Sequence, residues 1–489
     1  MLSASKIANQ FSQPLDRAAI ALIAVLTVAI ALLLFGGDST APRVRDFSWE
    51  DREIGAEERA FIVTFSRPMD RVSVEENLEI EPALPGKISW AGQRMAYTLD
   101  RPLPYGMEFE LEIEGARDRF DNPETATPID PYVGRFKSRD RAIVYLGVEE
   151  QERGQLILYN LTQGEKTVLT EDLMVMDYEP YPKGDRILFS ASDRHAGSNE
   201  LLEQKLYTVT TGRDGKPPGK IELVLDAKNY QNFSFDLSSD GSTILVQRLK
   251  KGKGGKVGLW MIKEGKKAKP LEAEPGGEFL ITPDSNAIAI AQGQGLAILP
   301  LEANAEPLEF LPKFAQVLDF SRNGAAAAMV KFNTDYTRSL FLVTNTGVQK
   351  ELRRIKGSIL DAEFSPDGKI LYTLLTTLIE GDEYREEPYI AAINLETEEA
   401  TTLVLLPKQR EIQMSLSPDG LGLLFDQIST TNRGRSQGSE AMPRTNSGEA
   451  IVTSRLWLLP LEPSIPPEEI DNLTPVDFPF RGLRPEWLP

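Results

Sequence analysis

The sequence predicts an all-β protein, in which a sandwich of short strands is followed by a ring of small four-stranded sheets. Short apolar runs alternate with polar residues over residues 44–137, and from residue 138 onward a turn tetrad flanked by apolar runs recurs. A third feature, one long apolar segment near the amino terminus, predicts a single membrane-spanning helix before the β domains. At 489 residues the chain is too long for one core, so two or more domains are expected.

The recurring tetrad defines a repeat array over residues 138–489. Successive tetrads start about 49 residues apart on average, and each full repeat has one apolar run before its tetrad and three after it. Four antiparallel strands at this period form a propeller blade, which predicts a seven-bladed β-propeller, with six or eight blades as alternatives. The tetrads start at Ser138 (SRDR), Tyr181 (YPKG), Ser238 (SSDG), Thr282 (TPDS), Ser321 (SRNG), Ser365 (SPDG), Ser417 (SPDG) and Arg484 (RPEW).

The two ends of the array complement each other. The first repeat, SRDRAIVYL, has no strand before its turn, whereas the last residues, VDFPFRGLRPEWLP, provide a strand and half a turn with nothing after them. We therefore expect the carboxyl-terminal strand to complete the first blade and to close the ring, which removes an exposed sheet edge.

The repeat array resembles the TolB-like β-propellers, which are related to WD-repeat proteins and carry the same Ser-Pro-Asp-Gly turn. Two tetrads, residues 365–368 and 417–420, match that turn completely. The resemblance implies a propeller that binds another macromolecule.

The segment 44–137 has the pattern of a sandwich. Phe109, Leu111 and Ile113 alternate with glutamates, as in a strand with one buried face. The motifs VTFSRPMD at 63–70, Asp118 with Asn122, and Gly134 with Phe136 resemble the bacterial Ig-like domain of the S-layer type. This resemblance implies a spacer or adhesive module.

Residues 18–35, AAIALIAVLTVAIALLLF, contain no charge and would form a helix of about 27 Å. We expect an uncleaved transmembrane helix at 18–36 after a cytoplasmic tail at 1–17; a cleaved signal peptide and a buried core helix are the alternatives. The predicted localisation is an inner or thylakoid-type membrane, with a single span and the bulk of the chain periplasmic.

The composition excludes several kinds of chemistry. The chain has no cysteine and a single histidine, so thiol catalysis and the usual transition-metal sites are not expected. No Gly-x-Ser-x-Gly nucleophile motif occurs, and the net charge of −19 disfavours nucleic acid as a partner. We therefore predict a protein that is not an enzyme and holds no cofactor. Alternatives are a carbohydrate-binding protein, a carboxylate-based hydrolase that uses the propeller channel, and a purely structural envelope component.

Long polar loops are predicted on one side of the ring, because the connection between the second and third strands has the same place in every blade. Binding usually concentrates on such loops. Arg194, His195, Tyr384 and Arg385 are the predicted contacts with a protein or other macromolecular partner in the cell envelope, since arginine and tyrosine are frequent among interface residues that carry affinity.

Overall fold

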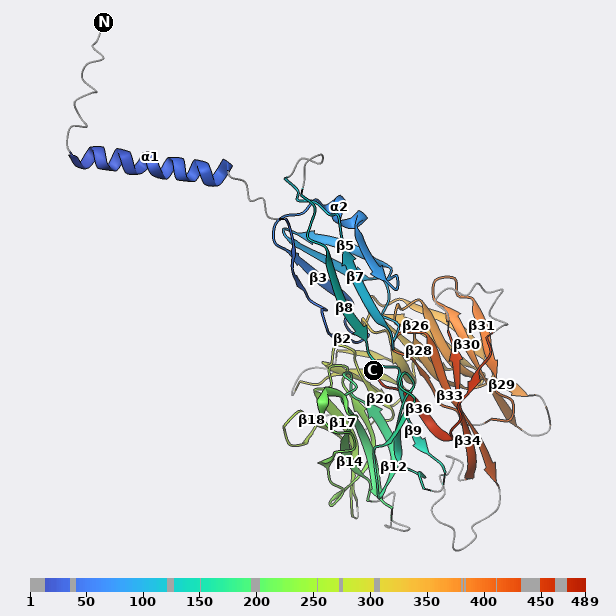
Figure 1. Cartoon of the computed structure of the whole chain (residues 1–489). Helices are drawn as coiled ribbons and strands as arrows, with labels where there is room; N and C mark the ends of the chain where they lie inside the picture. Colours follow the sequence, from blue (N-terminus) through green and yellow to red (C-terminus); the bar gives the residue numbers. More distant parts are fainter. Residues whose placement is uncertain are drawn as a thin grey trace. The chain divides into compact units, whose positions relative to one another are not determined.

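The chain divides into two units, and each is described by itself (Figure 1). The first unit comprises Met1–Arg52, Ala60–Thr98 and Phe109–Phe136, and the second comprises Glu53–Arg59, Leu99–Glu108 and Lys137–Pro489. The structure is a computed structural model, and it describes all residues except 1–13, 36–40, 121–126, 150, 195–202, 253, 272–275, 303–307, 380, 382–383, 410, 432–448 and 462–472.

Helix α1 (Pro14–Phe35) covers the apolar segment near the amino terminus. No helix in the described part of the chain combines the length and the apolar character that crossing a bilayer requires. The prediction of a transmembrane helix at 18–36 is therefore wrong, and so are the membrane partner and the single-pass localisation derived from it.

The first unit contains two sheets whose strands alternate between buried and exposed residues. Phe109, Leu111 and Ile113 are buried, which confirms the strand with one buried face that the sequence predicts. Phe136 packs between the sheets, with its ring 6.5 Å from that of Phe61 and 5.2 Å from that of Phe109. This arrangement does not by itself show the Ig-like family. One sheet has the order β1 (Val44–Phe47), β3 (Ala60–Phe65), β6 (Arg94–Leu99), β5 (Gly86–Ala91), and the other has β8 (Tyr132–Ser138), β7 (Glu108–Ile113), β4 (Leu78–Glu81) in this order. The short strand β2 (Glu53–Ile54) belongs to the second unit and pairs with Lys137 and Ser138 at the end of β8.

A short helix, α2 (Arg71–Glu76), follows β3. Its N-cap is Asp70, whose carboxylate accepts a hydrogen bond from the backbone N–H of Ser73 at 3.1 Å. Such caps satisfy one of the free N–H groups at the start of a helix.

The second unit consists of seven four-stranded antiparallel sheets, the blades of a β-propeller. First strands of successive sheets contact one another, which makes them the inner strands. From inner to outer strand, blade 1 is β36 (Gly482–Trp487), β9 (Ala142–Gly147), β10 (Leu156–Asn160), β11 (Glu165–Val168), and blade 2 is β12 (Leu173–Pro180), β13 (Arg186–Asp193), β14 (Lys205–Thr210), β15 (Ile221–Leu225), with helix η2 (Arg213–Gly215) between its last two strands. Blade 3 is β16 (Tyr230–Leu237), β17 (Thr243–Lys250), β18 (Val257–Lys263), β19 (Lys269–Pro270); blade 4 is β20 (Phe279–Ile281), β21 (Ala287–Gln292), β22 (Gly295–Pro300), β23 (Glu309–Leu311); and blade 5 is β24 (Gln316–Phe320), β25 (Ala326–Phe332), β26 (Arg338–Thr344), β27 (Gln349–Ile355). Blade 6 is β28 (Ile359–Phe364), β29 (Ile370–Ile379), β30 (Arg385–Asn394), β31 (Ala400–Leu405), and blade 7 is β32 (Met414–Leu416), β33 (Gly422–Thr431), β34 (Ala450–Pro460), β35 (Val476–Asp477).

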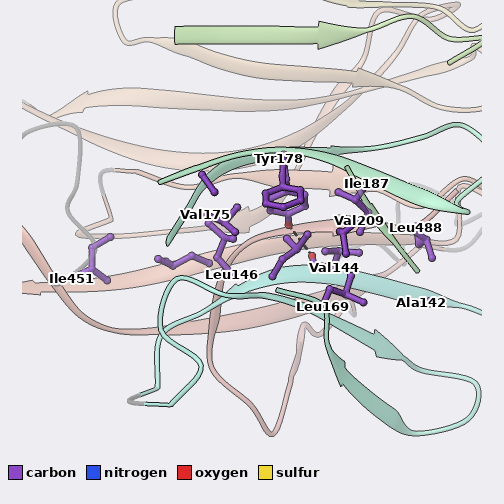
Figure 2. Close-up of a cluster of buried hydrophobic side chains, with 14 of the residues drawn as sticks. Ala142, Val144, Leu146, Leu169, Val175, Tyr178, Ile187, Val209, Ile451 and Leu488 are labelled. Atoms are coloured by element: carbon purple, nitrogen blue, oxygen red, sulfur yellow. Dashed lines mark hydrogen bonds between the residues drawn. The ribbon is translucent and has the colours of Figure 1, made fainter. Parts of the chain in front are cut away.

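A buried hydrophobic cluster lies between each blade and the next, from blade 1 round to blade 7 and back. Figure 2 shows the cluster between blades 1 and 2, where Tyr178 of β12 packs beside Val144 of β9. The Tyr178 hydroxyl donates a hydrogen bond of 2.8 Å to the Val144 carbonyl. Because every interface between blades buries apolar side chains, the packing runs unbroken around the second unit.

The carboxyl-terminal strand closes blade 1, which confirms the closure predicted from the sequence. Strand β36 pairs with β9, with Leu483 opposite Leu146 and Trp487 opposite Ile143. The final residue is also held, because the guanidinium of Arg213 donates to the Pro489 carbonyl. One detail differs, since the segment RPEW at 484–487 lies within β36 and is not a turn.

The Ser-Pro-Asp-Gly turn of blade 6 shows why the tetrad recurs. The hydroxyl of Ser365 donates to the carboxylate of Asp367 at 2.7 Å and accepts a hydrogen bond from the backbone N–H of Ile370 at 2.9 Å. Gly368 closes the turn with a φ of +71°, a conformation that favours glycine. The serine and aspartate thus satisfy polar groups of the turn that the strands leave free.

Candidate functional site

The four residues predicted to contact a partner lie on two separate blades. Arg194 follows β13 in blade 2, and its guanidinium donates to the Arg153 carbonyl at 2.6 Å. Arg385 is the first residue of β30 in blade 6 and pairs with Glu387, and Tyr384 directly precedes this strand. At least two other blades separate these positions on either side of the ring, so the structure does not bring Arg194 together with Tyr384. His195 lies outside the described residues.

Two exposed aromatic side chains that the sequence analysis did not single out, Phe332 and Tyr336, lie on the blade next to that of Tyr384. Phe332 ends β25 of blade 5 and is 61% exposed, Tyr336 in the following loop is 91% exposed, and Tyr384 is 74% exposed. Both connections join the second and third strands of adjacent blades. We call these three residues, with Arg338 and Glu386, the aromatic cluster.

Arg338 and Glu386 join the two blades beneath these rings. Arg338 lies 5.8 Å from the ring centre of Phe332 and 3.9 Å from the Glu386 carboxylate, and it donates to the Gly357 carbonyl at 2.7 Å. The hydroxyl of Tyr384 donates to the same carboxylate. The rings of Phe332 and Tyr384 therefore both contact the ion pair of Arg338 and Glu386.

Glu386 is held in its charged form. Burial acts to raise its pKa, but hydrogen bonds from Thr376, Tyr384 and Ser358, together with the charge of Arg338, outweigh burial and lower the pKa overall. A charged Glu386 keeps Arg338 and the Tyr384 hydroxyl in place near neutral pH.

The loop that carries Tyr336 is braced on both sides. Tyr336 itself has a φ of +65°, which is rare for a bulky residue. The carboxylate of Asp335 accepts hydrogen bonds from Thr337 and pairs with Arg354 at 2.7 Å, and the Asn333 amide donates to Thr337 at 3.0 Å. These bonds also lower the pKa of Asp335 to about 2, the Thr337 hydroxyl being the largest cause. A braced loop that holds an exposed tyrosine in an unfavourable conformation is typical of a recognition site.

A second group of polar residues lies on the inner strands. We call these residues the inner-strand carboxylates, and burial raises the pKa of each of them. The pKa rises to about 7 for Asp236 and Asp319 and to about 6 for Asp361. The inner-strand carboxylates are Asp177 and Glu179 of β12, Asp236 of β16, Asp319 of β24, Asp361 and Glu363 of β28, and Glu486 of β36.

Most inner-strand carboxylates bond a neighbouring blade. Asp319 accepts a hydrogen bond of 2.8 Å from the backbone N–H of Phe364, and Glu363 accepts one of 3.0 Å from Leu416. In each case the acceptor lies two residues before its turn tetrad, and the donor lies one residue before the tetrad of the next blade. Glu179 and Asp236 bond Leu237 and Ile281 in the same way. These four carboxylates therefore hold adjacent blades together.

Glu486 and Asp177 differ from that pattern. The residue that would donate to Glu486 is Pro180, which has no N–H, and Glu486 has no hydrogen-bond partner among the residues that the structure describes. Burial and then the charge of Asp177 raise the pKa of Glu486 well above its usual range. Asp177 pairs with Arg484 at 3.2 Å, and 51% of its side chain is exposed to solvent. Surrounding protein atoms nevertheless limit its hydration, and this raises the pKa of Asp177. Burial thus raises the pKa of both carboxyl groups, and only Asp177 has an ion-pair partner among the described residues.

The described residues offer no cluster of three histidine, aspartate or glutamate side chains with the geometry of a metal site.

Comparison with known proteins shows no family for this chain. No protein-family model and no curated protein matches the chain. Among solved structures, TolB from Acinetobacter baumannii is 13% identical, with a TM-score of 0.40 over 84% of this chain and 83% of that one. An oligogalacturonate lyase from Vibrio parahaemolyticus is 10% identical, with a TM-score of 0.44 over 58% and 88%, and an oligogalacturonate lyase in complex with manganese is 11% identical, with a TM-score of 0.45 over 56% and 79%. At these identities the similarity concerns the propeller fold alone.

The comparisons contradict the prediction that the chain is not an enzyme. Structures with this fold include enzymes such as the oligogalacturonate lyases. The prediction relied on missing cysteine, histidine and serine motifs, and a propeller can carry catalysis by other groups. The sequence analysis kept a carboxylate-based hydrolase as an alternative, and the inner-strand carboxylates are titratable groups of that kind.

Proposed function

We propose that the second unit binds a protein partner through the aromatic cluster. The observation that carries the proposal is the exposure of Phe332, Tyr336 and Tyr384 on two adjacent blades. An exposed aromatic ring leaves apolar surface in contact with water unless a partner covers it. Aromatic residues and arginine are enriched among the interface residues that carry most of the affinity. In this proposal the first unit, whose sequence resembles bacterial Ig-like domains, is a spacer.

The charges around the cluster favour a protein over a strongly charged partner. Arg338 pairs with Glu386 and Arg354 with Asp335, so neither guanidinium is available for phosphate groups. Because these charges are already compensated, covering the surface costs less desolvation than burying unpaired ions. Arg385, which also pairs with a carboxylate, lies at the edge of the cluster.

Photocrosslinking tests the proposal. A photoreactive phenylalanine replaces Tyr336 or Tyr384 in the full chain, produced in its native cell, and Phe310 of blade 4, which is 54% exposed, is the matched control position. We expect the same crosslinked protein at 336 and 384 and none at 310. The double substitution Tyr336→Ala and Tyr384→Ala should then remove capture of that protein while the melting temperature is unchanged. Equal adducts at all three positions would contradict the proposal.

A second candidate function is acid–base chemistry at Glu486 and Asp177. The supporting observation is that Glu486 has no described hydrogen-bond partner and a raised pKa, next to an Asp177 that pairs with Arg484. Carboxyl groups whose pKa values are raised by burial are suited to general acid and base catalysis, for example on glycosides.

Oligosaccharides incubated with the purified chain test this second function by mass spectrometry of the products. Turnover by the wild type that is lost in Glu486→Gln, and kept in Glu396→Gln on the exposed turn before β31, would support it. Turnover that survives in Glu486→Gln would count against it.

A further inference from the structure

The first unit contains a hollow of about 610 Å³ that none of the preceding sections uses. Its volume is far larger than a single phosphate ion and falls within the range typical of sites for small organic ligands. The walls come from the start of β1, the end of β3 and the segment after β7. Its lining residues are Ala41, Arg43, Arg45, Ser66, Arg67, Pro68, Asp118, Phe120 and Asp130.

Two of the three arginines in the hollow are free to bind a ligand. Arg67 is committed, because its Nε lies 3.5 Å from the Asp118 carboxylate, which is only 7% exposed. Arg43 and Arg45 are exposed, and neither makes an ion pair with any residue that the structure describes.

A β-bulge is what points Arg45 into solvent. Val44 pairs with Phe65 and Asp46 pairs with Thr64, so Arg45 is the extra residue between them. Regular alternation from buried Phe47 would place Arg45 on the buried face, because side chains two residues apart share a face. Bulges of this kind re-aim side chains and are frequent next to functional sites.

Backbone bonds hold Arg43 at the same wall. Its N–H donates to the Ser66 hydroxyl at 3.0 Å, and the Ser66 N–H donates to the Arg43 carbonyl at 2.8 Å. Both arginines therefore start from a fixed backbone, which lowers the entropic cost of binding.

The acidic residues of the hollow do not cancel this charge. Asp118 is already used, since it accepts a hydrogen bond of 2.8 Å from the N–H of Phe120 and pairs with Arg67. Asp130 is exposed, and among the lining residues its single negative charge is what remains to offset the two positive charges of Arg43 and Arg45. One formal positive charge is therefore left in the hollow. The ring of Phe120 is 78% exposed and provides an apolar wall.

We propose that the hollow binds a small phosphorylated or sulfated ring compound, such as a sugar phosphate. Arg43 and Arg45 donate hydrogen bonds to the oxyanion, a geometry for which planar guanidinium groups are well suited. The ring of the ligand packs on Phe120. Because the hollow lies wholly in the first unit, this site is independent of partner binding by the second unit.

Calorimetry of the full chain at low ionic strength tests the site with three probes: glucose 6-phosphate, inorganic phosphate and glucose. We expect glucose 6-phosphate to bind more tightly than phosphate and glucose not to bind at millimolar concentration. Arg43→Gln with Arg45→Gln should weaken both phosphates by about tenfold or more, since each charge-assisted hydrogen bond contributes about that factor. Arg94→Gln, an exposed arginine on β6 outside the hollow, is the matched control and should leave the affinity unchanged.

Two further variants should change ligand affinity in opposite directions. Asp130→Asn removes the one unpaired negative charge and should tighten phosphate binding, whereas Phe120→Ala should weaken glucose 6-phosphate and leave inorganic phosphate unchanged. Wild-type protein that binds neither phosphate, or a double arginine variant that binds as tightly as the wild type while both remain folded by circular dichroism, overturns the proposal.

Discussion

Replacing Asp319 with asparagine tests whether the inner-strand carboxylates are protonated in the folded protein. Burial raises the pKa of Asp319 to about 7, although the N–H groups of Phe364 and Phe320 favour the charged form, and the charge of Asp361 raises it further. In the unfolded chain the same carboxyl group titrates at about 3.9. The folded protein therefore keeps a proton on Asp319, between about pH 4 and pH 7, that the unfolded chain has released.

The sign of the effect follows from proton linkage. The state that binds more protons is favoured at low pH, so the contribution of Asp319 to the free energy of unfolding falls as the pH rises from about 4 to about 7. With these two pKa values, linkage gives a loss of about 2.6 kcal/mol between pH 5 and pH 8. Partial water access to the side chain reduces the expected loss to about 1–2.5 kcal/mol. Asparagine cannot ionise, so the D319N variant lacks this loss.

Urea denaturation at pH 5, 6, 7 and 8 measures the difference between the two proteins. At pH 5 we expect D319N to be less stable by about 1 kcal/mol, because the amide cannot accept both N–H groups that Asp319 accepts. That deficit should shrink or reverse by pH 8. Asp367→Asn, which removes a charge from an exposed turn, controls for the loss of one negative charge and should not show the trend. A D319N deficit that stays constant across the pH range would refute the reasoning.

Three other changes have defined outcomes. Deleting residues 476–489 removes β36 from blade 1, so the melting temperature in scanning calorimetry should drop far more than for an ordinary terminus, and an unchanged value would contradict the role of β36 in closure. Ser365→Ala removes the acceptor for the Ile370 N–H and should cost about 1–2 kcal/mol in urea unfolding; a cost near zero would show that water replaces the hydroxyl. Tyr336→Gly relieves the positive φ and should change the free energy of unfolding by less than about 1 kcal/mol while partner crosslinking through position 384 is lost.

The repeat pattern predicted the propeller because its signals are local. A turn such as Ser365–Gly368 satisfies its own polar groups within six residues, so its residues recur wherever the turn recurs. The closure by β36 was also predictable, because a repeat missing one strand and a tail of one strand must complement each other. Both inferences needed only chain order and strand count.

Features that depend on several blades, or on departures from regular geometry, were not predictable. Sequence spacing cannot tell that Arg194 and Tyr384 lie on blades separated around the ring. Nothing in the letters NTDYTR shows that Tyr336 adopts a positive φ, and alternation along β1 gives the wrong face for Arg45 because the bulge shifts the register. The membrane prediction rested on the apolar length of residues 18–35, and no helix in the described part of the chain is long and apolar enough to cross a bilayer.

The inner strands show how a structural rule isolates a functional candidate. An acid two residues before a tetrad bonds the N–H one residue before the next tetrad, so most of these acids are explained by holding blades together. In blade 4 the residue two positions before the tetrad is Leu280, whose side chain cannot accept a hydrogen bond. The N–H of Phe320 in blade 5, which such an acid would bond, instead donates to Asp319 at 2.8 Å. In blade 2 the donor position is Pro180, which has no N–H, so Glu486 of blade 1 lacks the hydrogen bond that the other acids make. A buried acid without its structural partner raises the energy of the fold unless it has another use, so Glu486 is the inner-strand residue whose presence a structural role does not explain.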